Sequence, residues 1–178
     1  YTLKSRTDRS LIMKDIKIIA FDADDTLWIN EPYFQETEHK FCALLEDFLP
    51  HHTVSQELFR TEMDNLSLYG YGVKGFMLCM IETISKVTDN KAKIGLVNRT
   101  IELGKELLRK PIKLIDGVEE VLKKLNGDYR LVMATKGDLL DQERILINSG
   151  FEKHFHHIEI MCNKKDEFFQ KLFKHLDF

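Results

Sequence analysis

A short apolar run leads straight into a cluster of acidic residues at Ile16-Lys17-Ile18-Ile19-Ala20-Phe21-Asp22-Ala23-Asp24-Asp25-Thr26-Leu27. The run is mostly apolar and β-branched, which is typical of a buried strand in a parallel sheet. The acidic residues follow at the carboxyl end of that strand, the edge at which open α/β sheets bind their ligands. The sequence therefore predicts that the carboxylates of Asp22 and Asp24 lie at a ligand-binding edge.

Two further strands of the same kind are predicted later in the chain. Residues 129–134 form an apolar run that stops at Thr135-Lys136-Gly137-Asp138, and the weaker run 157–161 stops at Cys162-Asn163-Lys164-Lys165. Apolar residues between and after these strands recur at helical spacing. Strands that alternate with helices predict an α/β fold, an open parallel sheet with right-handed crossovers.

A long interval, residues 30–114, breaks this alternation. Its apolar residues recur at helical spacing in four successive groups, with no strand pattern between them. We therefore expect an all-helical insertion there, and a sheet-bearing core formed by residues 15–29 and 115–178.

The amino-acid composition indicates which kind of partner the protein binds and where in the cell it is expected. The 178 residues, 43% of them hydrophobic, suffice for one domain with a core and a modest insertion. The net charge is −3 and the basic residues are scattered, which argues against nucleic acid. The three cysteines form no CxxC pair, no apolar run approaches the roughly 20 residues of a membrane span, and no signal peptide is recognisable. A cytoplasmic protein with a small-molecule partner and no membrane partner is expected.

The three strand ends carry groups that suit phosphoryl transfer to a carboxylate. This chemistry requires a nucleophile, an acid beside it, and positive charge around the phosphate oxygens. Residues i and i+2 of an extended segment point the same way, so Asp22 and Asp24 are expected to face one pocket. A divalent cation would relieve the repulsion between them, and Mg²⁺ is the natural ion for oxygen ligands.

The segment Asp22-Ala23-Asp24-Asp25-Thr26 resembles the DxDxT first motif of the haloacid dehalogenase superfamily. Thr135 follows the second strand, where that family places the Ser or Thr of its second motif. Lys164 follows the third strand, where the third-motif Lys is expected. The resemblance implies a Rossmann-like core and a C1-type helical cap formed by residues 30–114.

The resemblance also implies roles for individual residues. Asp22 would be the nucleophile and a Mg²⁺ ligand, and Asp24 the general acid and base that lends its backbone carbonyl to the metal. Thr135 and Lys164 would bind the phosphate and neutralise its charge. From the sequence alone, Thr135 could instead cap the following helix. Lys136 could equally line the pocket or face solvent.

The predicted function is hydrolysis of a small phosphorylated metabolite by a Mg²⁺-dependent phosphomonoester phosphatase. A phosphomutase with the same site, or a non-catalytic binding module of the same fold, remain alternatives. The dehalogenating branch of the family lacks the second acid, so Asp24 disfavours dehalogenation. Tyr69, Tyr71 and Lys74 of the insertion are candidates to contact the leaving group, although such residues more often pack or face solvent.

Two departures from the family pattern carry expectations of their own. Asp25 occupies a position that relatives often give to Gly, and we expect it to be a turn or capping residue. The acidic fourth motif is not found before Phe178, so the first strand would have a bare apolar edge. We expect further sequence or a partner chain to cover that edge, and self-association over it is one way to do so.

Overall fold

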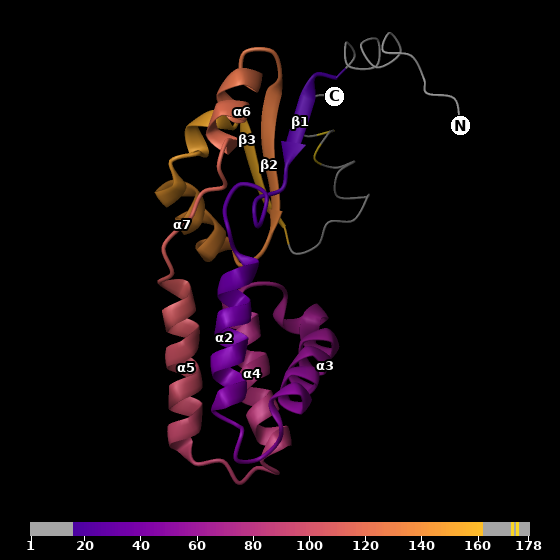
Figure 1. Cartoon of the computed structure of the whole chain (residues 1–178). Coiled ribbons are helices and arrows are strands. Elements are labelled where there is room, and N and C mark those ends of the chain that lie inside the picture. Colours follow the sequence, from indigo (N-terminus) through magenta and orange to yellow (C-terminus); the bar gives the residue numbers. More distant parts are fainter. Residues whose placement is uncertain (1–15, 162–171, 173, 175–178) are drawn as a thin grey trace, which may run out of the picture.

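The computed structural model describes residues 16–161 together with residues 172 and 174. A three-stranded sheet with flanking helices lies at one end and a bundle of four helices at the other (Figure 1). Lys164, Lys165 and most of the helical pattern at residues 168–176 lie outside the described residues.

The sheet consists of β1 (Ile18–Phe21), β2 (Arg130–Lys136) and β3 (His157–Met161) in the order β1-β2-β3. Both pairings are parallel, which confirms the predicted sheet. Five consecutive residues of β2, 131–135, are buried, as expected of a central strand covered on both faces. Within the described residues β1 pairs with β2 alone, and self-association over its other edge stays a prediction.

Two helices, one before β2 and one after it, pack on the sheet. α6 (Val118–Leu125) and α7 (Leu139–Ser149) contribute Leu122 and Leu146 to a buried cluster that contains alternate residues of β2. A short 3-10 turn, η1 (Glu152–His154), then leads into β3. This cluster also includes Ala23, Leu27, Trp28, Leu131, Met133 and Phe151.

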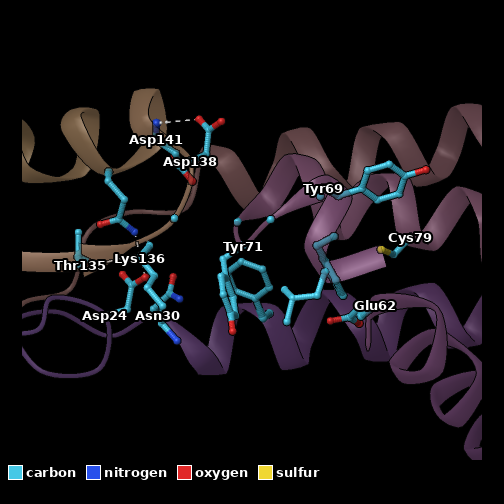
Figure 2. A pocket seen from close by; sticks show the side chains of 18 of the residues that line it. Asp24, Asn30, Glu62, Tyr69, Tyr71, Cys79, Thr135, Lys136, Asp138 and Asp141 are labelled. Atoms are coloured by element: carbon cyan, nitrogen blue, oxygen red, sulfur yellow. Dashed lines mark hydrogen bonds between the residues drawn. The ribbon is translucent and has the colours of Figure 1, made fainter. Parts of the chain in front are cut away.

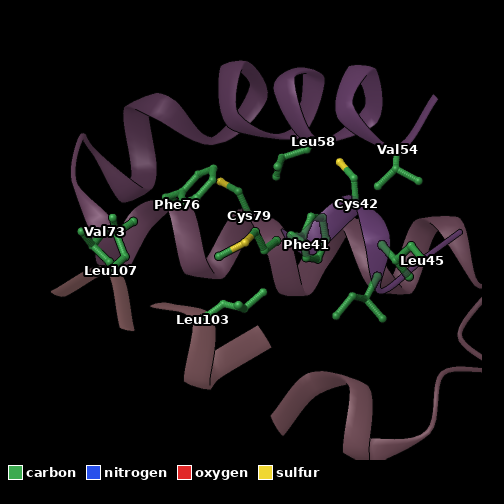
Figure 3. Close-up of a cluster of buried hydrophobic side chains, with 12 residues drawn as sticks. Phe41, Cys42, Leu45, Val54, Leu58, Val73, Phe76, Cys79, Leu103 and Leu107 are labelled. Carbon is green, nitrogen blue, oxygen red and sulfur yellow. The ribbon is translucent and has the colours of Figure 1, made fainter. Parts of the chain in front are cut away.

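The interval between β1 and α6 forms the helical bundle. Its members are α2 (Glu31–Ala43), α3 (His51–Tyr69), α4 (Val73–Val87) and α5 (Ile94–Leu108). They enclose a second apolar core, separate from that of the sheet (Figure 3). The prediction of an all-helical insertion in a parallel α/β fold is therefore confirmed. Among the described residues, no helix combines the length and the apolar composition of a membrane span.

The turn after β1 depends on Asp25. Its backbone is left-handed, with φ of 55°, a conformation that Gly adopts without cost and Asp tolerates. Its carboxylate accepts hydrogen bonds from the backbone N–H groups of Asn30 (2.9 Å) and Glu31 (3.0 Å) at the start of α2. The expectation of a turn and capping residue is confirmed, and the φ value explains why Gly is an alternative there.

Replacing Asp25 with Ala should destabilise the protein by about 1 kcal/mol, because α2 loses its capping acceptor and the new side chain fits a left-handed backbone poorly. Asp25→Asn is the matched control, since it keeps an acceptor oxygen and tolerates this conformation. Urea unfolding of the two variants and the wild type measures the difference. Equal unfolding midpoints for Asp25→Ala and the wild type would refute the capping role.

Candidate active site

A cavity of about 290 Å³ lies between the carboxyl edge of the sheet and the helical bundle. The sheet-bearing part contributes Asp22, Asp24, Thr135 and Lys136, four of the five predicted site residues. The bundle contributes, among others, Phe34, Glu62, Met63, Leu66, Tyr69, Tyr71, Phe76 and Cys79. Figure 2 shows Asp24 and Thr135 near one end of the cavity and Glu62 near the other, with Tyr71 between them.

The two motif carboxylates reach the cavity because of strand geometry. Ala23 is fully buried in the sheet core, so the residues on either side of it point away from that core. Asp22 is exposed to the cavity, and its Oδ1 accepts a hydrogen bond of 2.9 Å from the Ala23 N–H. An accessible carboxylate at a strand end has the placement that a nucleophile needs.

Asp24 is held differently from Asp22. Its Oδ1 accepts a 2.9 Å hydrogen bond from Trp28 Nε1, and its Oδ2 accepts one of 3.0 Å from Gln142 Nε2. Burial raises the pKa of Asp24 and outweighs these two hydrogen bonds, which lower it; the nearby charges of Asp22 and Asp25 raise it further. A fixed carboxyl with a raised pKa suits the transfer of a proton to and from a substrate.

Trp28 and Gln142 are site residues that sequence reasoning missed. Both are almost completely buried, at 1% and 5% exposed. Gln142 lies on α7, 118 residues from Asp24, and no local pattern connects the two. Trp28 gives a weak signal, because a Trp directly after an acidic turn needs an acceptor for its ring N–H.

Thr135 and Lys136 lie at the end of β2. Thr135 is 1% exposed, and its Oγ1 donates a long hydrogen bond of 3.4 Å to the Lys136 carbonyl oxygen. The N-cap of α7 is Asp138, whose side chain accepts from the Asp141 N–H, so the helix-capping alternative for Thr135 is wrong. Lys136 lines the cavity, with its Nζ 4.3 Å from the centroid of the Tyr71 ring.

The bundle contacts the strand ends through the turn between α3 and α4. Lys74 Nζ lies 3.0 Å from both carboxylate oxygens of Asp138. A Cβ added to Gly72, which has φ of 110°, would lie 3.1 Å from the Asp138 backbone nitrogen, so the two loops are in close contact. Tyr69 also lines the cavity, and its hydroxyl donates a hydrogen bond to Glu82 on α4.

The fit of a metal ion can be judged from the two acids. Residues 16–161, 172 and 174 contain no group of three or more acidic, His or Cys side chains placed to hold a metal. Both carboxylate oxygens of Asp24 accept hydrogen bonds from Trp28 and Gln142, whereas the Asp22 carboxylate is exposed at the cavity, where a metal ion can reach it. Mg²⁺ commonly binds through one or two carboxylates together with water and phosphate oxygens, and this site fits that mode.

Glu62, on α3, is a further acid of the cavity with a perturbed pKa. Burial, and to a smaller extent the carboxylates of Glu38 and Glu31, raise the pKa of Glu62 to about 7. No sequence pattern singles out Glu62, because a Glu on an amphipathic helix ordinarily faces solvent.

The free energy of unfolding should depend on pH through Glu62. The unfolded chain releases this proton near pH 4.5 and the folded protein only near pH 7, so stability falls as the pH rises between these values. Glu62→Gln should therefore be more stable than the wild type at about pH 8, by on the order of 1 kcal/mol, and equal to it below the unfolded pKa. Urea unfolding across this range, with Asp64→Asn on the same helix as control, measures the difference. A constant difference at all pH values would contradict the assignment.

A parallel sheet that carries paired carboxylates at its carboxyl edge, beneath a helical bundle, defines a Rossmann-like α/β protein with an acidic ligand site. The family model of the haloacid dehalogenase-like hydrolases matches residues 16–176, and this chain belongs to that family. No curated protein matches the sequence.

Solved structures agree with the family. A haloacid dehalogenase-like family hydrolase from Xanthomonas campestris has 35% sequence identity and a TM-score of 0.85, with coverage of 91% of this chain and 68% of that one. A predicted phosphoglycolate phosphatase from Haemophilus somnus 129pt has 17% identity and a TM-score of 0.57, covering 91% and 72%. A 2-haloacid dehalogenase from Pseudomonas syringae pv. Tomato DC3000 has 16% identity and a TM-score of 0.57, covering 91% and 73%. The last two share only the fold, and the fold alone does not choose between their activities.

Proposed function

We propose that this hydrolase is a Mg²⁺-dependent phosphomonoester phosphatase that acts through an aspartyl-phosphate on Asp22. The observation that carries the proposal is Asp24, a carboxyl with a raised pKa that Trp28 and Gln142 hold in the same cavity as Asp22. Ester hydrolysis needs an acid for the leaving alkoxide, whereas displacement of a halide does not. The substrate would be a small phosphorylated metabolite.

In the first step, a carboxylate oxygen of Asp22 attacks phosphorus and the bond from phosphorus to the ester oxygen breaks. Asp24 gives its proton to the departing alkoxide, so the alcohol leaves neutral. In the second step, Asp24 takes a proton from water, the water oxygen attacks phosphorus, and the Asp22 carboxylate is released. Thr135, which lines the same end of the cavity as Asp24, would hydrogen-bond the phosphoryl oxygens.

Positive charge is needed around the transferring group. Lys136 supplies a cation at the strand end, and Lys164 remains a proposal from the family resemblance because it lies outside the described residues. Mg²⁺, held by the Asp22 carboxylate and the Asp24 backbone carbonyl, would supply further charge stabilisation when bound. The helical bundle would act as the cap, and its half-exposed ion pair between Lys74 and Asp138 is weak enough to open, at less than about 1 kcal/mol.

The function is tested by product analysis on the complete protein. Phosphate should be released from 4-nitrophenyl phosphate with Mg²⁺, and both EDTA and fluoroberyllate should abolish the release. Halide release from 2-chloropropionate without phosphatase activity would instead identify a dehalogenase. Retention of phosphate on an added sugar phosphate would identify a phosphomutase, and absence of all three activities would favour a binding module.

A further inference from the structure

The cavity continues past the catalytic end into the helical bundle, where its walls become apolar. Phe34 of α2 and Phe76 of α4 line this part, together with Met63 and Leu66 of α3. Glu62 lies there, away from Asp24 and Thr135 (Figure 2). This part of the cavity also borders a second hollow between α2 and α3. The residues that line both are Glu31, Phe34, Glu62, Met63 and Phe76.

The Glu62 carboxyl is partly buried and has no hydrogen-bond or ion-pair partner among the described residues. Glu57, one turn earlier on α3, pairs with Arg60 and Lys86. Glu82 accepts hydrogen bonds from Asn65 and Tyr69. No hydrogen bond or ion pair reaches Glu62 from residues 16–161, yet apolar neighbours partly remove it from water. A carboxylate so placed is stabilised when a cation or a hydrogen-bond donor joins it.

The charged residues around Glu62 favour a positively charged ligand over a negatively charged one. The acids Glu31 and Glu38 on α2 are the charged groups that act on it most strongly, and both repel a negative ligand. Arg60 lines the adjoining hollow but is engaged by Glu57. Lys136, the cation that lines the main cavity, lies over Tyr71 toward the strand ends. One end of the cavity is therefore suited to a phosphate and the other to a cation, with an apolar passage between them.

We propose that Glu62 binds a protonated amine on the alcohol part of the substrate, so that the preferred substrates are phosphate monoesters of amino alcohols. This inference rests on the proposed phosphatase function. An ammonium group offers three donors to the acceptor-only carboxylate, and the aliphatic stem would pack on Phe34 and Phe76. A matching alkyl phosphate would leave the partly buried Glu62 carboxyl without a partner, which penalises its binding.

The test compares ω-aminoalkyl phosphates of increasing length with n-alkyl phosphates of the same number of heavy atoms. At the best length, kcat/KM should favour the amine by about tenfold or more. Glu62→Gln should remove most of this preference, chiefly by raising KM for the amine. Asp64→Asn removes the same charge from the exposed side of α3 and should leave the preference intact. Calorimetric binding of both ligand series to Asp22→Asn gives a second measurement that needs no turnover.

The outcomes separate this inference from the function on which it rests. Phosphate release from both series with equal efficiency, or a preference that survives Glu62→Gln, would overturn the amine site and leave the phosphatase in place. Preferential binding of the amines to Asp22→Asn without hydrolysis by the wild type would support the amine site and overturn the phosphatase. Neither hydrolysis nor preferential binding would overturn both.

Discussion

Asp22→Asn is expected to lower kcat for 4-nitrophenyl phosphate by roughly a thousandfold or more. An amide cannot attack phosphorus to form the acyl phosphate, and it is a poorer ligand for Mg²⁺ than a carboxylate. The substitution changes neither the size of the side chain nor its acceptor oxygen for the Ala23 N–H, so the fold should persist. Steady-state phosphate release at saturating Mg²⁺ measures the effect.

The matched control is Asp25→Asn, which removes a negative charge from the same motif. Asp25 directs its carboxylate to the start of α2 and does not line the cavity, so its neutral variant should retain most activity. A comparable loss of activity in both variants would mean that activity depends on the total negative charge of the motif and not on a nucleophile at position 22. Full activity of Asp22→Asn would refute the proposed chemistry.

Asp24→Asn is expected to show a loss that depends on the leaving group, because only good leaving groups depart without a proton. For alkyl phosphates, kcat should fall by roughly 10²–10⁴-fold. For 4-nitrophenyl phosphate the first step should persist, while hydrolysis of the aspartyl-phosphate slows for want of a base. Rapid mixing should then show a burst of 4-nitrophenolate that is stoichiometric with enzyme.

The geometry makes this variant informative. Asn at position 24 can still accept from Trp28 Nε1, and its amide can donate to the Gln142 side-chain oxygen, which has no partner among the described residues. The site should therefore keep its shape while losing its transferable proton. Equal losses for aryl and alkyl phosphates, without a burst, would contradict the role of Asp24 as acid and base.

The sequence predicted the parts of this site that depend on local geometry. A buried strand followed by Asp22-Ala23-Asp24 determines which way the two carboxylates point, because side-chain direction alternates along an extended chain. The positions of Thr135 and Lys136 could be predicted as well, because they lie at the end of β2 and parallel strands end at the same edge of a sheet. The structure was needed to choose between pocket and solvent for Lys136, and to reject helix capping for Thr135.

The contacts that tune the site could not be predicted, because they join segments far apart in the chain. Gln142 reaches Asp24 from α7, and Tyr71 covers Lys136 from the bundle. Glu62 has the sequence signature of a solvent-facing residue, and only the packing of α2 and α4 around it creates its apolar surroundings. Such properties follow from how the bundle sits on the sheet, which local periodicity does not determine.

The central claim, that Asp22 carries the phosphoryl group, is tested most directly by trapping the intermediate. The wild-type protein is mixed with substrate and Mg²⁺, quenched in acid during turnover, and reduced with borohydride, which converts an aspartyl-phosphate to homoserine. Peptide mass spectrometry should then find homoserine at position 22, and none at positions 24 and 25 or in a sample without substrate. Turnover with unmodified Asp22, or with homoserine at another aspartate, would contradict the account.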